Sequence, residues 1–104
     1  MLLGKPVITT DYSGTRDFAT AGTALLVGGE LVPVGQDEYP GADGQVWAEA
    51  DIDQAATAMR RIASDRPLAE RLGRAGRARI RELYDPHVIG ARYLARFAAI
   101  AKRT

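Results

Sequence analysis

The fold is decided by the stretch Met1-Leu-Leu-Gly-Lys-Pro-Val-Ile-Thr-Thr-Asp-Tyr-Ser-Gly-Thr-Arg-Asp-Phe18. Gly4 suits the left-handed residue that closes a helix, and Pro6 prevents that helix from continuing. Residues 7–10 are all β-branched, which is typical of a short buried strand in a parallel sheet. The stretch therefore predicts the last turn of a helix followed by a strand, and we expect the chain to be part of something larger.

The polar segment after this strand is the candidate ligand site. In open α/β sheets, ligands bind beyond the carboxyl ends of the strands. Ser13 offers a hydroxyl group, and Gly14 allows close approach of the backbone to a sugar or phosphate. The candidate binding residues are Asp11, Tyr12, Ser13, Gly14 and Thr15. Taken alone, these residues favour an ordinary strand-to-helix turn over a ligand loop.

A family resemblance supports the ligand loop. Residues 3–8, 10–14 and 17–18 resemble bacterial glycosyltransferases of the retaining GT-B type, the group 1 glycosyl transferases. The resemblance continues in the same order through residues 31–34, 38–41, 44–49, 55–56 and 59–61, and then through 72–77 and Tyr84. Each piece is short, and the specificity of the match comes from their order and spacing over nearly the whole chain.

The resemblance implies an α/β fold and a role in sugar transfer. The expected fold is a partial Rossmann-like unit, a fragment of the GT-B C-terminal domain, with one or two short parallel strands followed by three helices. Residues 1–104 would be one domain that is incomplete at its N-terminus. The Glu-x7-Glu motif of such enzymes would lie upstream of Met1, so no catalytic residue is assigned. The donor would be a nucleotide sugar, bound only together with the missing N-terminal part, with no cofactor.

Composition bounds the remaining classes of function. The chain has 104 residues, no cysteine and a hydrophobic fraction of 46%, as expected for one small cytoplasmic domain, with the inner face of the membrane as another location. No apolar run is long enough for a transmembrane segment. The formal charge of +1 is unevenly spread, because residues 1–51 carry two basic and eight acidic groups, whereas residues 52–104 carry twelve and five.

Three helices are predicted after residue 51. Asp51, with Gln54 three residues later, forms a capping-box pattern, and Asp65 and Asp85 each precede a proline-marked helix start. The first helix is expected to have one apolar face, formed by Ile52, Ala55, Ala56, Met59, Ile62 and Ala63. The second would bury Leu68, Leu72, Ala75, Ile80 and Leu83, and the third would place Ile89, Tyr93, Phe97 and Ile100 on one face.

Two glycines in the second predicted helix are poor helix formers. Gly73 and Gly76 each cost up to about 1 kcal/mol relative to alanine. Close approach of another backbone would compensate for that cost. At the end of the third helix, Phe97 and Ile100 are expected either to be exposed or to repack locally.

The middle of the chain is less regular. Residues 24–27 predict a second strand that ends at Gly28, and Pro33 argues against a central strand over residues 31–34. Residues 39–44 are expected to form a turn-rich loop. We interpret Trp47 as an anchor that packs this loop onto the helices, in preference to a sugar-stacking platform.

The sequence signals for nucleic-acid binding, membrane binding and metal binding are weaker. The arginines between residues 71 and 81 favour a solvated helix face over a nucleic-acid or membrane patch, so no nucleic-acid partner is expected. His87 has no second ligand or nucleophile nearby in sequence, and no metal-binding spacing is present. The alternative to a transferase fragment is a small helical interaction module that self-associates through exposed apolar surface.

Overall fold

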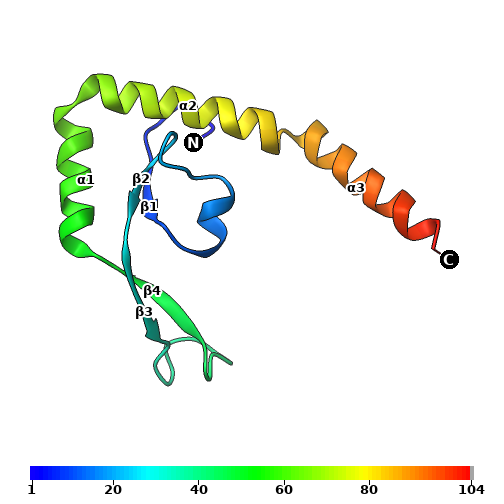
Figure 1. Ribbon diagram of the computed structural model, residues 1–104, viewed down its shortest axis with the longest axis horizontal. Coiled ribbons are helices and arrows are strands. Elements are labelled where there is room, and N and C mark those ends of the chain that lie inside the picture. Colours follow the sequence, from blue (N-terminus) through cyan, green and yellow to red (C-terminus); the bar gives the residue numbers. More distant parts are fainter. Residues whose placement is uncertain (104) are drawn as a thin grey trace.

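The computed structural model describes residues 1–103 as a flat, open α/β arrangement. Its extents are 55 × 42 × 17 Å, and its radius of gyration is 17.9 Å. A compact chain of this length has a radius of gyration of about 13 Å. Figure 1 shows the cause, because a hairpin and the last helix extend as two arms from a small centre.

The predicted parallel pair is confirmed. Strand β1 (Ile8–Thr10) pairs in parallel with β2 (Leu25–Val27), with Ile8 opposite Leu25. Backbone hydrogen bonds lengthen the ladder at both ends, from Leu25 N to Val7 O and from Asp11 N to Val27 O, each 2.9 Å. The observed class is mixed α/β with a short parallel pair.

An antiparallel hairpin fills the region where irregular loops are predicted. Strand β3 (Gly29–Pro33) follows β2 after the single residue Gly28 and pairs with β4 (Val46–Ala50). Pro33 occupies the last position of β3, where a two-stranded ladder has free edges that tolerate proline. The turn-rich loop predicted over residues 39–44 is confirmed, and β2 ends before Gly28 as predicted. The prediction of an irregular region is wrong for the strands β3 and β4 on either side of that loop.

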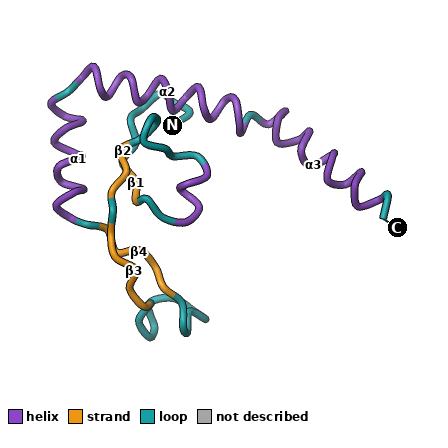
Figure 2. The backbone as a smooth tube through the Cα atoms, viewed as in Figure 1, coloured by secondary structure: helices purple, strands orange, loops and turns teal. Residues whose placement is uncertain are grey.

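The three predicted helices are confirmed: α1 (Ile52–Ser64), α2 (Arg66–Tyr84) and α3 (Pro86–Ala101). The side chains of Asp51, Asp65 and Asp85 accept hydrogen bonds from the backbone N–H groups of Gln54, Leu68 and His87. Each aspartate satisfies one N–H group that a helix start leaves unpaired. Figure 2 shows α2 and α3 as one nearly continuous path with a bend between them.

The small core lies where α2 crosses the start of the chain. Its buried apolar side chains include Ala19, Ala24, Val27, Leu68 and Leu72. A Cβ built on Gly73 would lie 2.1 Å from Gly4 O, and one on Gly76 would lie 3.3 Å from Thr23 O. The predicted close approach at both glycines is thus confirmed, and Gly4 has the predicted left-handed backbone, with φ of 71°.

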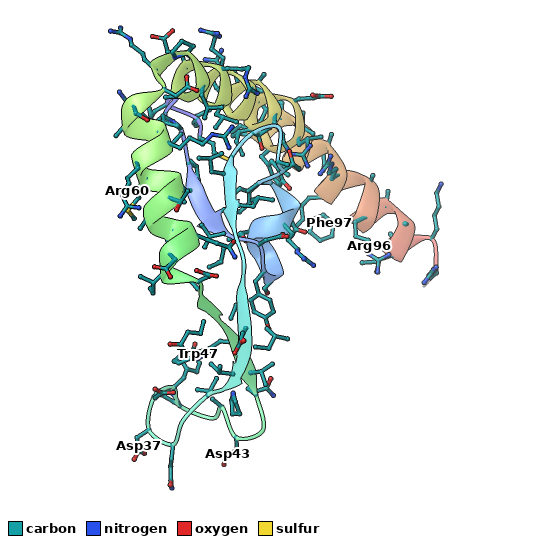
Figure 3. All side chains as sticks on the ribbon, turned by 60° about the vertical axis from the view of Figure 1, so that its left-hand side comes forward. Asp37, Asp43, Trp47, Arg60, Arg96 and Phe97 are labelled. Carbon is teal, nitrogen blue, oxygen red and sulfur yellow. The ribbon has the colours of Figure 1, made fainter. Side chains whose placement is uncertain are left out.

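Several predicted apolar contacts are absent from the described residues. In α1, Ile52 is 76% exposed and Met59 is 61% exposed, because that edge of the helix has no facing element. Trp47 lies on β4, away from the helices, so its prediction as an anchor onto them is wrong (Figure 3). Phe97 and Ile100 are exposed, as one of the two predictions for α3 stated.

Candidate functional site

The candidate loop lies directly beyond the carboxyl end of β1. Asp11 extends the parallel ladder, and residues Ser13–Asp17 then form a short 3-10 helix. Ser13, the first residue of this helix, has a positive φ of 53°, an uncommon conformation for a residue other than glycine. The strand therefore delivers Asp11 and Tyr12 to the end of the sheet before the chain turns away.

Hydrogen bonds fix the shape of this loop from within. Thr15 Oγ1 lies 2.8 Å from Thr10 O and 2.7 Å from Tyr12 O, so its one proton is shared by the two carbonyl oxygens. This hydroxyl closes the loop onto the end of β1. Thr15 is therefore positioned as a structural residue, and its hydroxyl proton is already engaged.

Helix α2 holds the far end of the loop. Arg79 donates from Nε to Phe18 O at 3.0 Å and from Nη2 to Asp17 O at 3.2 Å. The Tyr84 hydroxyl donates to Asp17 O at 2.9 Å. Three donors from one helix thus satisfy the carbonyl oxygens at the end of the 3-10 helix, and they position the loop relative to the core.

An ion pair lies within the loop. Arg16 Nε donates to Asp11 Oδ1 at 2.8 Å, and both side chains are substantially exposed. This hydrogen bond and the attraction between the two charges raise the pKa of Arg16 above its usual value. The pairing uses one nitrogen of the guanidinium fork, whose other nitrogens can face an anion.

A hollow of about 290 Å³ lies beside this ion pair. Its lining joins the end of the parallel pair to the hairpin and comprises Thr10, Asp11, Tyr12, Arg16, Val27, Gly28, Gly29, Leu31 and Ala48. Tyr12 spans the two parts, because its hydroxyl donates a long hydrogen bond of 3.5 Å to Val46 O on β4. The hollow is thus built by both sheets of the molecule.

The structure brings two of the five candidate residues to this hollow. Asp11 and Tyr12 line it, whereas Ser13, Gly14 and Thr15 do not. Ser13 and Gly14 are exposed on the outer side of the loop. Sequence reasoning missed Arg16, Leu31 and Ala48. The spacing of Asp11 and Arg16 across a short turn was a usable signal for an ion pair, whereas Leu31 and Ala48 depend on the unpredicted hairpin.

A second hollow, of about 420 Å³, opens on the other side of Gly29. Acidic and amide side chains surround it, namely Glu30, Glu49, Asp51 and Gln54. Gln54 Oε1 accepts from Gly28 N and its Nε2 donates to Asp51 Oδ2, both at 2.9 Å. Gln54 therefore ties the start of α1 to the single residue between β2 and β3.

The chemistry available here is that of binding. Asp11 accepts hydrogen bonds from hydroxyl groups, Arg16 offers a positive charge, and Tyr12 presents a ring and a hydroxyl. Within residues 1–103, no group of three or more histidine or acidic side chains is arranged to hold a metal ion. His87 lies at the exposed start of α3, away from this loop in sequence and on another element.

Comparisons with known proteins found no match among protein-family models, curated proteins or solved structures. In the described part of the chain, every helix is too short or too polar to cross a bilayer. The interpretation of the site therefore depends on its own geometry and on the sequence resemblance described above.

Proposed function

We propose that this chain forms part of the nucleotide-sugar-binding domain of a glycosyltransferase, with a Rossmann-like relationship between its parallel strands and helices. The hollow beside Asp11, Tyr12 and Arg16 would contact the donor. The observation that carries the proposal is the position of these polar side chains beyond the carboxyl ends of two parallel strands, where α/β proteins bind their ligands. The order of the resembling segments supports the same function.

The side chains present suit different parts of such a donor. Asp11 would accept hydrogen bonds from sugar hydroxyls, and the free edge of the Arg16 guanidinium would face a phosphate oxygen. The ring of Tyr12 would cover one side of the sugar. Because the described residues provide no pair of carboxylates fixed for acid and base chemistry, the function proposed for the chain by itself is binding, with negligible transferase turnover.

Titration followed by ¹H–¹⁵N NMR tests this proposal. With UDP-glucose or GDP-mannose at concentrations up to about 10 mM, we expect saturable shifts confined to residues 10–16 and 27–31, since a shallow site of this size gives only weak affinity. Asp11→Asn and Arg16→Gln should each weaken binding at least about fivefold. Asp43→Asn, which lies at the hairpin tip (Figure 3), is the matched control and should leave the titration unchanged.

Two results would contradict the proposal. The first is an absence of saturable shifts with either nucleotide sugar. The second is a set of shifts that is unaffected by the Asp11 and Arg16 substitutions, which would place binding elsewhere. Turnover of a nucleotide sugar at an enzyme-like rate would contradict the narrower expectation that the chain alone binds without catalysis.

A further inference from the structure

The last helix presents an apolar stripe beside a cationic one. Ile89, Tyr93, Phe97 and Ile100 recur at helical spacing and share one face of α3. Arg92 and Arg96 lie one position before Tyr93 and Phe97 and form the neighbouring stripe. Residues 86–103 contain no aspartate or glutamate, so the charge of this arm is wholly positive.

This helix face is open to solvent. Tyr93, Phe97 and Ile100 are 61%, 61% and 46% exposed. Tyr93 and Phe97 contact only each other among aromatic rings of the described residues, with centroids 6.2 Å apart. Exposed apolar side chains that adjoin one another on one helix face mark an interaction surface.

The hairpin presents the complementary surface. Because Val32 lies opposite Trp47 and Glu30 opposite Glu49, these four side chains share one face of the β3–β4 ladder. Trp47, Val32 and Glu49 also line a hollow of about 470 Å³ together with Glu38. We call Glu30, Val32, Glu38, Trp47 and Glu49 the acidic hairpin face.

This acidic face carries an uncompensated electrostatic cost. Like charges directly opposite one another in a β-ladder are destabilising, and Glu30 and Glu49 form such a pair. Residues 29–50 contain five acidic residues and neither lysine nor arginine. A cationic partner laid across this face would relieve the repulsion while covering Trp47.

The two surfaces belong to arms that extend in different directions. Figure 1 shows α3 and the hairpin projecting from separate parts of the centre, and Figure 3 places Arg96 and Phe97 on a different arm from Trp47. A helix cannot reach the hairpin of its own chain in this arrangement. The matching surfaces are therefore available to each other only between molecules.

We propose that α3 of one copy docks on the acidic hairpin face of a second copy, and that the second copy returns the same contact. A two-fold dimer of this kind is self-complementary and leaves neither arm open. Stable interfaces use roughly 20–30 residues from each partner. Only one face of the 16-residue α3 can contact a partner, so the two-fold arrangement, in which each copy adds its hairpin face, supplies the larger contact that a stable dimer needs. This pairing is independent of nucleotide-sugar binding.

Charge exchange between the two surfaces tests the dimer. One variant carries Arg92→Glu and Arg96→Glu, and the other carries Glu30→Arg and Glu49→Arg. Each should be monomeric by sedimentation equilibrium at about 50 μM, where the unmodified chain is a dimer, because each places like charges at the interface and weakens it at least about 100-fold. An equimolar mixture of the variants should regain the dimer.

A control variant with Arg60→Glu and Arg71→Glu changes the net charge equally on the exposed surfaces of α1 and α2, and it should remain dimeric. Circular dichroism at 222 nm checks that each variant keeps its helices. The proposal is overturned if the unmodified chain is a monomer, if the control dissociates as readily as the two variants, or if the mixture stays monomeric. A monomer that binds vesicles of anionic lipid through Arg92 and Arg96 would assign α3 to a membrane surface instead.

Discussion

Replacing Gly73 with alanine directly tests how α2 is joined to the rest of the chain. A Cβ at this position would lie 2.1 Å from Gly4 O and 2.9 Å from Gly4 C, both backbone atoms. An ordinary contact begins near 3.4 Å, so the helix and the first turn must separate by about 1 Å. Overpacking of this kind costs about 1–3 kcal/mol, and more where backbone must move.

The helix itself gains from the same substitution, which lowers the net effect. Alanine is favoured over glycine inside a helix by about 1 kcal/mol. We expect the cost of the clash to lie at or above about 3 kcal/mol, because both facing atoms are backbone atoms. Subtracting the helix gain leaves a net loss of about 2 kcal/mol in the free energy of unfolding. For a domain of this size that loss lowers the melting temperature by about 8–16 °C.

Gly90→Ala supplies the matched control. Gly90 lies inside α3, and a Cβ built there meets no atom within 4 Å. This variant should gain up to about 1 kcal/mol from helix propensity alone. Urea unfolding followed by circular dichroism measures both variants. If Gly73→Ala is as stable as Gly90→Ala, α2 does not contact the first turn as described, and the account of the core is refuted.

Three further perturbations follow from single contacts. Asp51→Ala removes the α1 cap and the partner of Gln54 Nε2, so urea unfolding should show a loss of about 1 kcal/mol; no change would mean that the cap is not formed in solution. Tyr84→Phe removes the hydrogen bond to Asp17 O and should cost about 1 kcal/mol, with faster amide exchange in residues 16–18; unchanged exchange would contradict this role. The pKa of Arg16 is raised in the folded chain, so its pairing with Asp11 contributes to the free energy of unfolding below the unfolded pKa and is lost only when strongly alkaline pH passes the folded pKa. The difference in the free energy of unfolding between the unmodified chain and Arg16→Gln should therefore be constant from about pH 6 to about pH 10. A slope in that window would contradict the pairing of Arg16 with Asp11.

Elements with local signals were predictable from sequence. The three helix starts depend on an aspartate and the residues just after it, and all three aspartates cap as expected. The β1–β2 pair follows from two short apolar runs separated by turn formers. The close approaches at Gly73 and Gly76 were also signalled, because glycine is a costly choice inside a helix unless space is restricted.

The hairpin was not predicted from the sequence, because its two strands are far apart along the chain. Twelve residues, 34–45, separate β3 from β4, and the connection bends through positive φ values at Asp37, Gly41 and Gly44. A two-residue turn of the kind that marks hairpins in sequence is absent from this connection. Trp47 was misassigned for the same reason, since its neighbours are set by the register of β4.

The candidate site shows the same difference between local signals and long-range pairing. Asp11 and Tyr12 follow their strand immediately, so the rule for α/β sheets located them. Ser13 and Gly14 do not line the hollow, and the left-handed backbone at Ser13 was not indicated by residue type alone. Leu31 and Ala48 reach the hollow only through the pairing of β3 with β4, a long-range contact that no local pattern specifies.

The contact between Gly4 and Gly73 also constrains the order in which the molecule folds. About 70 residues separate the two glycines, so closing the loop between them carries a substantial entropic cost before any contact is gained. During synthesis, the first turn has no partner until most of α2 has left the ribosome. The helices and the hairpin can form early from local contacts, whereas we expect the core around Leu72 to be completed late.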